Sequence, residues 1–208
     1  LATFPRENIN DGIWNQIKDG IKRLSENQNQ CNQSNRYHRK EFPKGSEDFN
    51  GIINYLQKQT KTLIENEIKI TDSSIYDNDV YRYDPYESIR YQTENFFCTK
   101  DIPNSWICFE FKNHRIIPTH YTIRSRKDGL CAPVNYTIEI SDNSLTWYEI
   151  DAQNEDPFTD GNQATFTFAI AENKQKEAKY LRLTQTGKNS SGTDILSFES
   201  IEFYGNLK

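Results

Sequence analysis

Short stretches in which apolar and polar residues alternate constrain the fold of this chain more than any other feature. The clearest lies at 134–141, where four apolar residues are separated by polar ones: Val134, Tyr136, Ile138 and Ile140. Successive side chains of a strand point to opposite faces, so this alternation predicts a strand with one face in water. The Ser-Asp-Asn-Ser stretch at 141–144 favours a turn, because Asp and Asn bond their own main chain. We therefore expect a partner strand to begin near Trp147 and to pair with the first.

Strands of this kind are expected along most of the chain from residue 67 onward. They lie near 67–72, 95–99, 105–112, 116–125, 134–141, 146–151, 163–170, 178–186 and 197–204. Turn-forming Gly, Asn and Asp residues separate several of them. No helix alternates with these strands and no fixed-period repeat is present. The pattern predicts an all-β fold built from antiparallel strands, either a sandwich or a jelly roll.

Before residue 67 the apolar residues follow a helical spacing instead. Five of them recur every three or four residues and predict an amphipathic helix over about 8–25: Ile9, Ile13, Ile17, Ile21 and Leu24. The polar stretch 26–41 is interpreted as a linker. A second short helix is expected at 47–58. The resulting division is an N-terminal extension over 1–45, followed by a β-sandwich domain over 46–208 with its strands between 67 and 205.

Composition narrows the functional classes. The chain has 208 residues, a net charge of −5 and a sequence pI of about 5.3, which argue against general binding to nucleic acid or to an anionic membrane. No run of 18 apolar residues is present, so membrane insertion is not expected. The four cysteines form no Cys-x-x-Cys pair, so a zinc site is not expected. The absence of Met favours a piece of a longer protein.

Several strings of the sequence resemble one known family. They are FNGIINYL (49–56), EIKITDSS (67–74), PNSWICFEF (103–111), PTHYTIRS (118–125), YLRLTQTGKN (180–189) and IEFYG (201–205). Together they resemble discoidin-like domains, also called coagulation factor V/VIII C-type domains. The resemblance is to an intracellular protist sub-family whose members follow ankyrin or BTB modules in scaffold proteins. It implies a galactose-binding-like jelly roll of about eight strands and a non-catalytic role. The chain departs from the family pattern at 76–85 and 126–133, so the binding habit of the family does not carry over.

Ligands of discoidin-like sandwiches sit on loops at one end of the fold, and by strand order these loops are 75–86, 100–104 and 126–133. Their aromatic and basic residues are the candidate ligand-binding set: Tyr76, Tyr81, Arg82, Tyr83, Lys100, Arg126 and Lys127. Tyr rings stack on a pyranose or fill a protein pocket, and the basic groups add hydrogen bonds. The alternative is that several of these tyrosines only cover the end of the sandwich.

A metal site and an active site are weaker hypotheses than the ligand-binding loops. Three carboxylates in the first loop supply oxygens for a structural calcium ion as a weak alternative: Asp77, Asp79 and Asp84. A metal group of His114, His120 and Glu110 is a further weak alternative. No phosphate loop, nucleophile elbow or zinc-protease motif occurs, so we expect neither an enzyme nor a required cofactor.

Two prominent residues are assigned to the fold rather than to a site. Trp147 is expected to fill the end of the core beside Ile150. Arg182 is expected to pair with a carboxylate of the last strand, Glu199 or Glu202.

These observations favour a protein-interaction domain of a larger intracellular, cytoplasmic scaffold. The alternative is a carbohydrate-binding module, exposed or secreted, that uses the tyrosine-rich loop 76–86. The expected partner is thus a protein or a glycan. Frequent Asn, Ile, Lys and Tyr are typical of an AT-rich genome and favour a protist source.

Overall fold

The computed structural model describes residues 16–23, 39–45, 47–60, 63–79, 81–91, 95–158 and 163–208. The chain divides into two units, Leu1–Arg39 and Lys40–Lys208. In the first unit, residues 16–23 form an exposed helix inside the expected range 8–25. The rest of that expected helix, and most of the expected linker, lie outside the described residues. No helix in the described ranges combines the length and apolar character needed to cross a bilayer.

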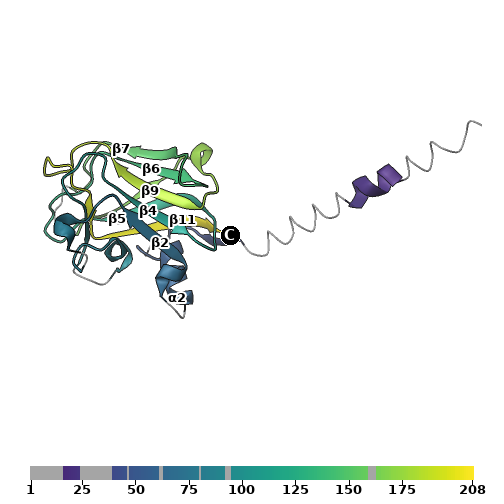
Figure 1. Cartoon of the computed structure of the whole chain (residues 1–208), viewed down its shortest axis with the longest axis horizontal. Coiled ribbons are helices and arrows are strands. Elements are labelled where there is room, and N and C mark those ends of the chain that lie inside the picture. Colours follow the sequence, from purple (N-terminus) through teal and green to yellow (C-terminus); the bar gives the residue numbers. More distant parts are fainter. Residues whose placement is uncertain are drawn as a thin grey trace, which may run out of the picture. The chain divides into compact units, whose positions relative to one another are not determined.

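The larger unit is built from two main antiparallel sheets and a small strand pair (Figure 1). The four-stranded sheet has the order β1 (Lys40–Phe42), β11 (Ser200–Leu207), β5 (Ile116–Arg124), β8 (Thr165–Ala169). The five-stranded sheet has the order β2 (Ile68–Asp72), β4 (Trp106–Phe111), β9 (Tyr180–Gln185), β6 (Tyr136–Ser141), β7 (Tyr148–Gln153). The small pair joins β3 (Phe97–Cys98) to β10 (Ser197–Phe198). The predicted all-β antiparallel sandwich is confirmed.

Helical structure in the larger unit is short. Among the described residues of this unit, it consists of α2 (Ile52–Gln59) and four short 3₁₀ helices: η1 (Ile64–Asn66), η2 (Tyr76–Asn78), η3 (Pro85–Ile89) and η4 (Glu172–Lys174). The helix expected at 47–58 begins only at Ile52, because Phe49 adopts a left-handed backbone with φ of 57°. That conformation buries the Phe49 ring against Tyr91, with centroids 4.9 Å apart, and is incompatible with a continuing helix.

Two further segments differ from the expectation. Strand β1 lies in a stretch interpreted as linker and loop, and it pairs with the end of β11 through Lys40 opposite Leu207. The strand expected at 197–204 is two strands, β10 and β11, in different sheets. A bulge follows within β11 at Gly205, where φ is 135° and an added Cβ would lie 2.1 Å from the Ile117 carbonyl oxygen. Local alternation of side chains does not encode either feature.

The core lies between the inner faces of the two sheets. Phe109 of β4 and Phe203 of β11 meet edge to face across it, with ring centroids 5.4 Å apart. Toward one side, Tyr121 and Tyr136 are fully buried, and the Tyr121 hydroxyl donates to the Asp151 carboxylate at 2.6 Å. Every second residue of β4, β6 and β9 faces this core, as the alternation predicts.

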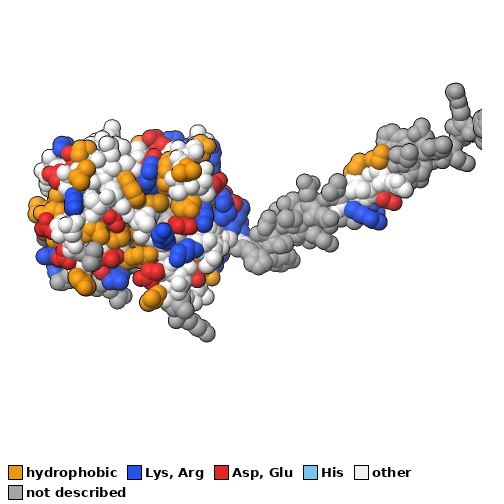
Figure 2. Space-filling model, in the orientation of Figure 1, with side chains coloured by type: hydrophobic (Ala, Val, Ile, Leu, Met, Phe, Trp, Pro, Cys, Tyr) orange, Lys and Arg blue, Asp and Glu red, His pale blue; other side chains and the backbone are white. Residues whose placement is uncertain are grey.

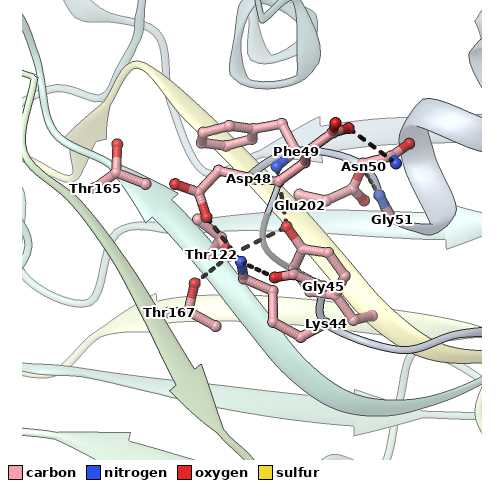
Figure 3. Close-up of polar contacts among 12 residues, drawn as sticks. Lys44, Gly45, Asp48, Phe49, Asn50, Gly51, Thr122, Thr165, Thr167 and Glu202 are labelled. Carbon is pink, nitrogen blue, oxygen red and sulfur yellow. Dashed lines mark hydrogen bonds and ion pairs between the residues drawn. The ribbon is translucent and has the colours of Figure 1, made fainter.

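The fully buried Glu202 carboxylate ties the start of α2 to strand β11. Its Oε1 accepts the N–H groups of Ile53 and Phe203, and its Oε2 accepts those of Gly51 and Asn54. Figure 3 shows Glu202 beside Gly51 at this turn. Three of these donors belong to the first turn of α2, whose N–H groups have no partner within the helix. Burial raises the pKa of Glu202, whereas the four backbone donors lower it.

Gly51 is required at this junction. A Cβ added there would lie 2.4 Å from the Phe203 carbonyl oxygen and 2.8 Å from Cδ of Glu202. The backbone of the turn therefore approaches β11 more closely than any side chain permits.

The structure corrects the two residues that were assigned to the fold. Trp147 lies half-buried on the outer face of the five-stranded sheet, with the Arg182 guanidinium 4.0 Å from its ring. Arg182 pairs with Glu139 of β6 at 2.9 Å, and not with Glu199 or Glu202. The reason is topological, since β9 lies between β4 and β6 and the last strand belongs to the other sheet.

Replacement of Glu202 tests the junction. A Glu202→Gln variant keeps the shape but directs an amide NH₂ at backbone N–H donors, so we expect the free energy of unfolding to fall by about 2–3 kcal/mol. Urea titration followed by circular dichroism measures this. The exposed Glu155→Gln serves as control and should match the parent. Equal stability of both variants would contradict the role of Glu202.

Two buried thiols give a pH-dependent prediction. Burial raises the pKa of Cys98 from 9.0 to about 11 and that of Cys108 from 9.0 to about 12. The folded chain thus keeps these protons where the unfolded chain loses them, so stability is full below about pH 9 and declines as pH rises toward 12. Urea midpoints at pH 8, 9 and 10 should fall in that order. The Cys98→Ser, Cys108→Ser variant should fall less, and an unchanged decline in it would refute the assignment.

Candidate functional site

Four loops meet at one end of the sandwich. They are the described residues of 73–84, 95–105, 126–133 and 187–196, which we call the rim. The N–H of Lys100 donates to Ser74 Oγ at 3.1 Å, and the N–H of Asp194 donates to Asp101 Oδ1 at 2.7 Å. The N–H of Cys131 donates to Ser191 Oγ at 2.9 Å. These bonds join all four segments, so residues far apart in sequence form one surface.

An aromatic cluster occupies the rim. The Tyr76 and Tyr83 rings meet edge to face with centroids 5.4 Å apart, and Tyr83 also packs on Phe96 at 5.4 Å. The guanidinium of Arg126 lies 4.0 Å from the centre of the Phe96 ring, and that of Arg82 lies 5.5 Å from Tyr83. The structure therefore brings four of the expected site residues together: Tyr76, Arg82, Tyr83 and Arg126.

Phe96 belongs to the cluster but was missed by the sequence analysis. It precedes the fully buried Phe97, so the two rings of this Phe-Phe pair point to opposite sides of the strand. The sequence did contain a signal for Phe96. Its side chain is opposite a core residue, at the end of a strand that adjoins the expected loops. The adjacent pair of apolar residues hid it, because the pattern resembles a strand buried on both faces.

The other expected site residues lie on the same loops but outside the ring cluster. Tyr81 is 90% exposed, and its backbone N–H donates to Asp79 Oδ1. Lys100 is half-buried beside Ser74. Lys127 is exposed next to Arg126. The expected alternative, that some tyrosines cover the end of the sandwich, thus describes Tyr83 better than Tyr81.

Charges of both signs alternate across the rim. Arg126 forms an ion pair with Asp128, and Lys188 forms one with Asp194. Burial raises the pKa of Asp72 below the rim, and the nearby Asp84 carboxylate raises it further. Charged groups at a binding surface contribute more to the orientation and selection of a partner than to the affinity for it.

The structure does not support the calcium alternative. Asp79 Oδ1 accepts the N–H groups of Tyr81 and Arg82, and Asp84 Oδ1 accepts the Tyr86 N–H at 2.7 Å. Two of the three carboxylates, Asp79 and Asp84, therefore serve as backbone caps, while Asp77 is exposed. No group of three His, Cys, Asp or Glu side chains that could hold a metal occurs among the described residues.

The His114, His120 and Glu110 alternative is likewise wrong. His114 Nε2 lies 3.4 Å from Glu67, whereas Glu110 pairs with Lys179 at 2.9 Å. Glu110 is on β4 and His120 is on β5, which belong to different sheets. Their closeness in sequence does not bring them together in space.

Solved structures similar to this chain share its fold. An F5/8 type C domain from Bacteroides fragilis matches with a TM-score of 0.55 and 13% identity, covering 67% of this chain and 92% of its own. A carbohydrate-binding module of Clostridium perfringens, in complex with GalNAc-β-1,3-galactose, matches with a TM-score of 0.53 and 16% identity, over 67% and 96%. A serum fucolectin of striped bass, Morone saxatilis, matches with a TM-score of 0.52 and 20% identity, over 67% and 47%.

Two curated proteins resemble the sequence itself. The E3 ubiquitin-protein ligase Ufd4 of Drosophila melanogaster is 31% identical over 113 residues, which cover 52% of this chain and 4% of the ligase. The E3 ubiquitin-protein ligase hecd-1 of Caenorhabditis elegans is 31% identical over 94 residues, or 44% and 4%. The chain thus spans a small fraction of the relatives it matches. No protein-family model matches the sequence.

These likenesses confirm the discoidin-like, galactose-binding-like fold expected from the sequence strings. At 13% to 20% identity, these solved structures show the fold that the chain shares with them.

Substitution of two rim tyrosines by alanine should change the free energy of unfolding by different amounts. Tyr83→Ala removes contacts with two rings, so we expect a loss of about 1–3 kcal/mol in the free energy of unfolding. Tyr81→Ala should change it by less than about 0.5 kcal/mol, because that side chain is exposed. Thermal and urea unfolding of the two variants measure the difference. A Tyr81→Ala loss as large as that of Tyr83→Ala would disprove this division of roles.

Proposed function

We propose that this chain is a protein-interaction module of a larger intracellular protein, and that it recognises its partner through the rim. Tyr81, Arg82 and Lys100 are the proposed contact residues, with the ring cluster as their rigid support. The module itself carries out no chemistry.

The packing of the aromatic cluster carries the proposal. Tyr76, Tyr83 and Phe96 pack on one another, and Arg126 covers Phe96. A pyranose stacks on the open face of an aromatic ring, and these rings are already in contact. The rim presents outward Tyr81, with the exposed Arg82 beside it, and also the exposed Ile102 and Leu130. Tyr and Arg are the residues most enriched in the energetic centres of protein interfaces.

The distribution of side chains on the outer surface favours binding of a partner through a few residues. On the face of the larger unit drawn in Figure 2, hydrophobic side chains lie scattered among basic and acidic ones. Scattered apolar residues are normal on a surface and do not by themselves mark an interface. Affinity would therefore come from a few anchors such as Tyr81 rather than from a broad apolar area.

Sequence similarity to the two E3 ubiquitin-protein ligases supports the setting in a larger protein. Each match covers only 4% of a ligase, which is the size of one module in a long chain. The free thiols of Cys98, Cys108 and Cys131 in the described part of the chain agree with a reducing, intracellular location.

A glycan is the second candidate for the rim. The observation in its favour is that two structural neighbours are a fucolectin and a module bound to GalNAc-β-1,3-galactose. In that case the exposed Tyr81 ring would supply the stacking face, and Arg82 would donate to sugar hydroxyls.

Parallel screening separates the two candidates. The chain is tested against a displayed peptide library and a glycan array, together with Tyr81→Ala and Arg82→Ala. We expect peptide binders whose affinity falls at least about tenfold in both variants. Tyr148→Ala is the matched control, because that tyrosine is 58% exposed on β7, outside the rim.

Other outcomes have definite meanings. Glycan binding that is lost in Tyr81→Ala, without rim-dependent peptide binders, would replace the protein proposal with the sugar alternative. Binders of either kind that are insensitive to Tyr81→Ala and Arg82→Ala would show that the rim is not the binding surface.

A further inference from the structure

Both tryptophans in the described part of the chain lie on the outer face of the five-stranded sheet. Trp106 begins β4 near the rim, and Trp147 reaches over the sheet from the β6–β7 loop at the opposite end. Both are half-buried and line one surface cavity of about 480 Å³, which we call the tryptophan trough.

The depth of the trough comes from contrasting side-chain sizes. Across three neighbouring strands, Thr71 lies opposite Cys108, and Cys108 lies opposite Arg182. Thr71 and Cys108 are short and form a low floor. Trp106 lies at one end of this floor and Tyr180 at the other, and both line the cavity. The strand register therefore builds a hollow between aromatic ends.

The side wall of the trough is held in place before any ligand binds. The indole N–H of Trp147 donates to the Ser144 carbonyl oxygen at 3.2 Å, and the Arg182 guanidinium stacks 4.0 Å from the ring. Arg182 is itself fixed by Nε donating to Glu139 at 2.9 Å. A preorganised wall lowers the entropic cost of binding.

Two side chains that line the trough, Trp106 and Arg182, have N–H groups available to a ligand. The Trp106 indole N–H makes no hydrogen bond within the described residues, and Arg182 uses only its Nε. One acceptor of the trough is engaged, because Glu110 Oε1 receives both Lys179 and the Tyr180 hydroxyl. Three lining residues are charged: Glu110 pairs with Lys179, Arg182 pairs with Glu139, and Lys69 forms no ion pair within the described residues. The trough therefore suits an acceptor-rich, acidic ligand with apolar surfaces.

The length of the trough fits a short extended peptide. From Trp106 to Glu110 the strand advances four residues, which is about 13 Å. Four residues of polyproline II helix span about 12 Å, and their carbonyl groups have no internal hydrogen bonds. Proline rings pack on aromatic side chains, and such carbonyls accept from indole N–H and guanidinium groups.

We propose that the tryptophan trough binds a proline-rich, extended peptide segment that carries acidic residues. The prolines pack against Trp106 and Trp147. The peptide carbonyl oxygens accept from the Trp106 indole N–H and the Arg182 guanidinium, and its carboxylates meet Lys69. This site is on the sheet face and is independent of the function proposed for the rim.

Titration of the whole chain with a synthetic peptide of three Pro-Pro-Glu repeats tests this site. Calorimetry and ¹⁵N-resolved NMR should show saturable binding that shifts the Trp106 indole signal. A peptide of three Pro-Pro-Lys repeats should bind at least about tenfold more weakly, because it opposes the basic lining. Trp106→Ala and the exposed Lys69→Ala should each weaken binding of the acidic peptide, the first at least about tenfold.

Controls keep the trough and the rim apart. Tyr81→Ala and Tyr148→Ala should leave peptide binding unchanged, since neither side chain lines the trough. If Trp106→Ala does not fold, Lys69→Ala and Arg182→Lys carry the test. The proposal fails if millimolar peptide leaves the Trp106 indole signal unmoved, or if the Pro-Pro-Lys peptide binds equally well. It also fails if Tyr81→Ala abolishes binding, or if galactose or N-acetylgalactosamine shifts the Trp106 indole signal in place of the peptide.

Discussion

The buried Glu202 carboxylate is the contact on which the arrangement of this domain most depends. It gathers four backbone N–H groups from the start of α2 and from β11. A buried carboxylate costs several kcal/mol unless its oxygens are fully used, and here both are. Because β11 lies between β1 and β5 in its sheet, this contact fixes the segment that precedes β2 against a central strand. The same contact requires glycine at position 51, because the backbone there lies too close to β11 to leave room for a Cβ atom.

The two sheets then separate the core of the domain from the two surfaces that we propose as binding sites. Their inner faces form one aromatic and aliphatic core, in which Phe109 and Phe203 meet across the interface. The loops at one end are joined by hydrogen bonds and carry the ring cluster of the rim. The outer face of the five-stranded sheet carries the tryptophan trough. A rigid sandwich can hold two such surfaces because neither contributes to closing the core.

Much of the fold was predictable from local sequence. A period of two in the apolar residues identified the strands, including the buried alternation of β4, β6 and β9. The resemblance to discoidin-like domains, applied by strand order, placed Tyr76, Arg82, Tyr83 and Arg126 on loops that the structure brings together. The period of two missed the three-residue β1, whose Lys40–Phe42 segment has no pattern long enough to read, and it missed Phe96 because the adjacent Phe97 obscured the alternation. The grouping of His114, His120 and Glu110 was wrong because Glu110 and His120 lie on strands of different sheets. The structure does not support the calcium grouping, because Asp79 and Asp84 accept backbone N–H groups.

The sequence by itself determined which residues form strands and which side of each strand faces water, because that information repeats every two residues. Only the tertiary structure decided which strands became neighbours. Arg182 faces outward, as the alternation indicates, but its partner Glu139 lies 43 residues away in sequence. Trp147 became a wall of the trough rather than part of the core, because the β6–β7 loop folds back over β9. Which strands become neighbours depends on the pairing energy summed over a whole sheet. A short segment of sequence does not carry that information.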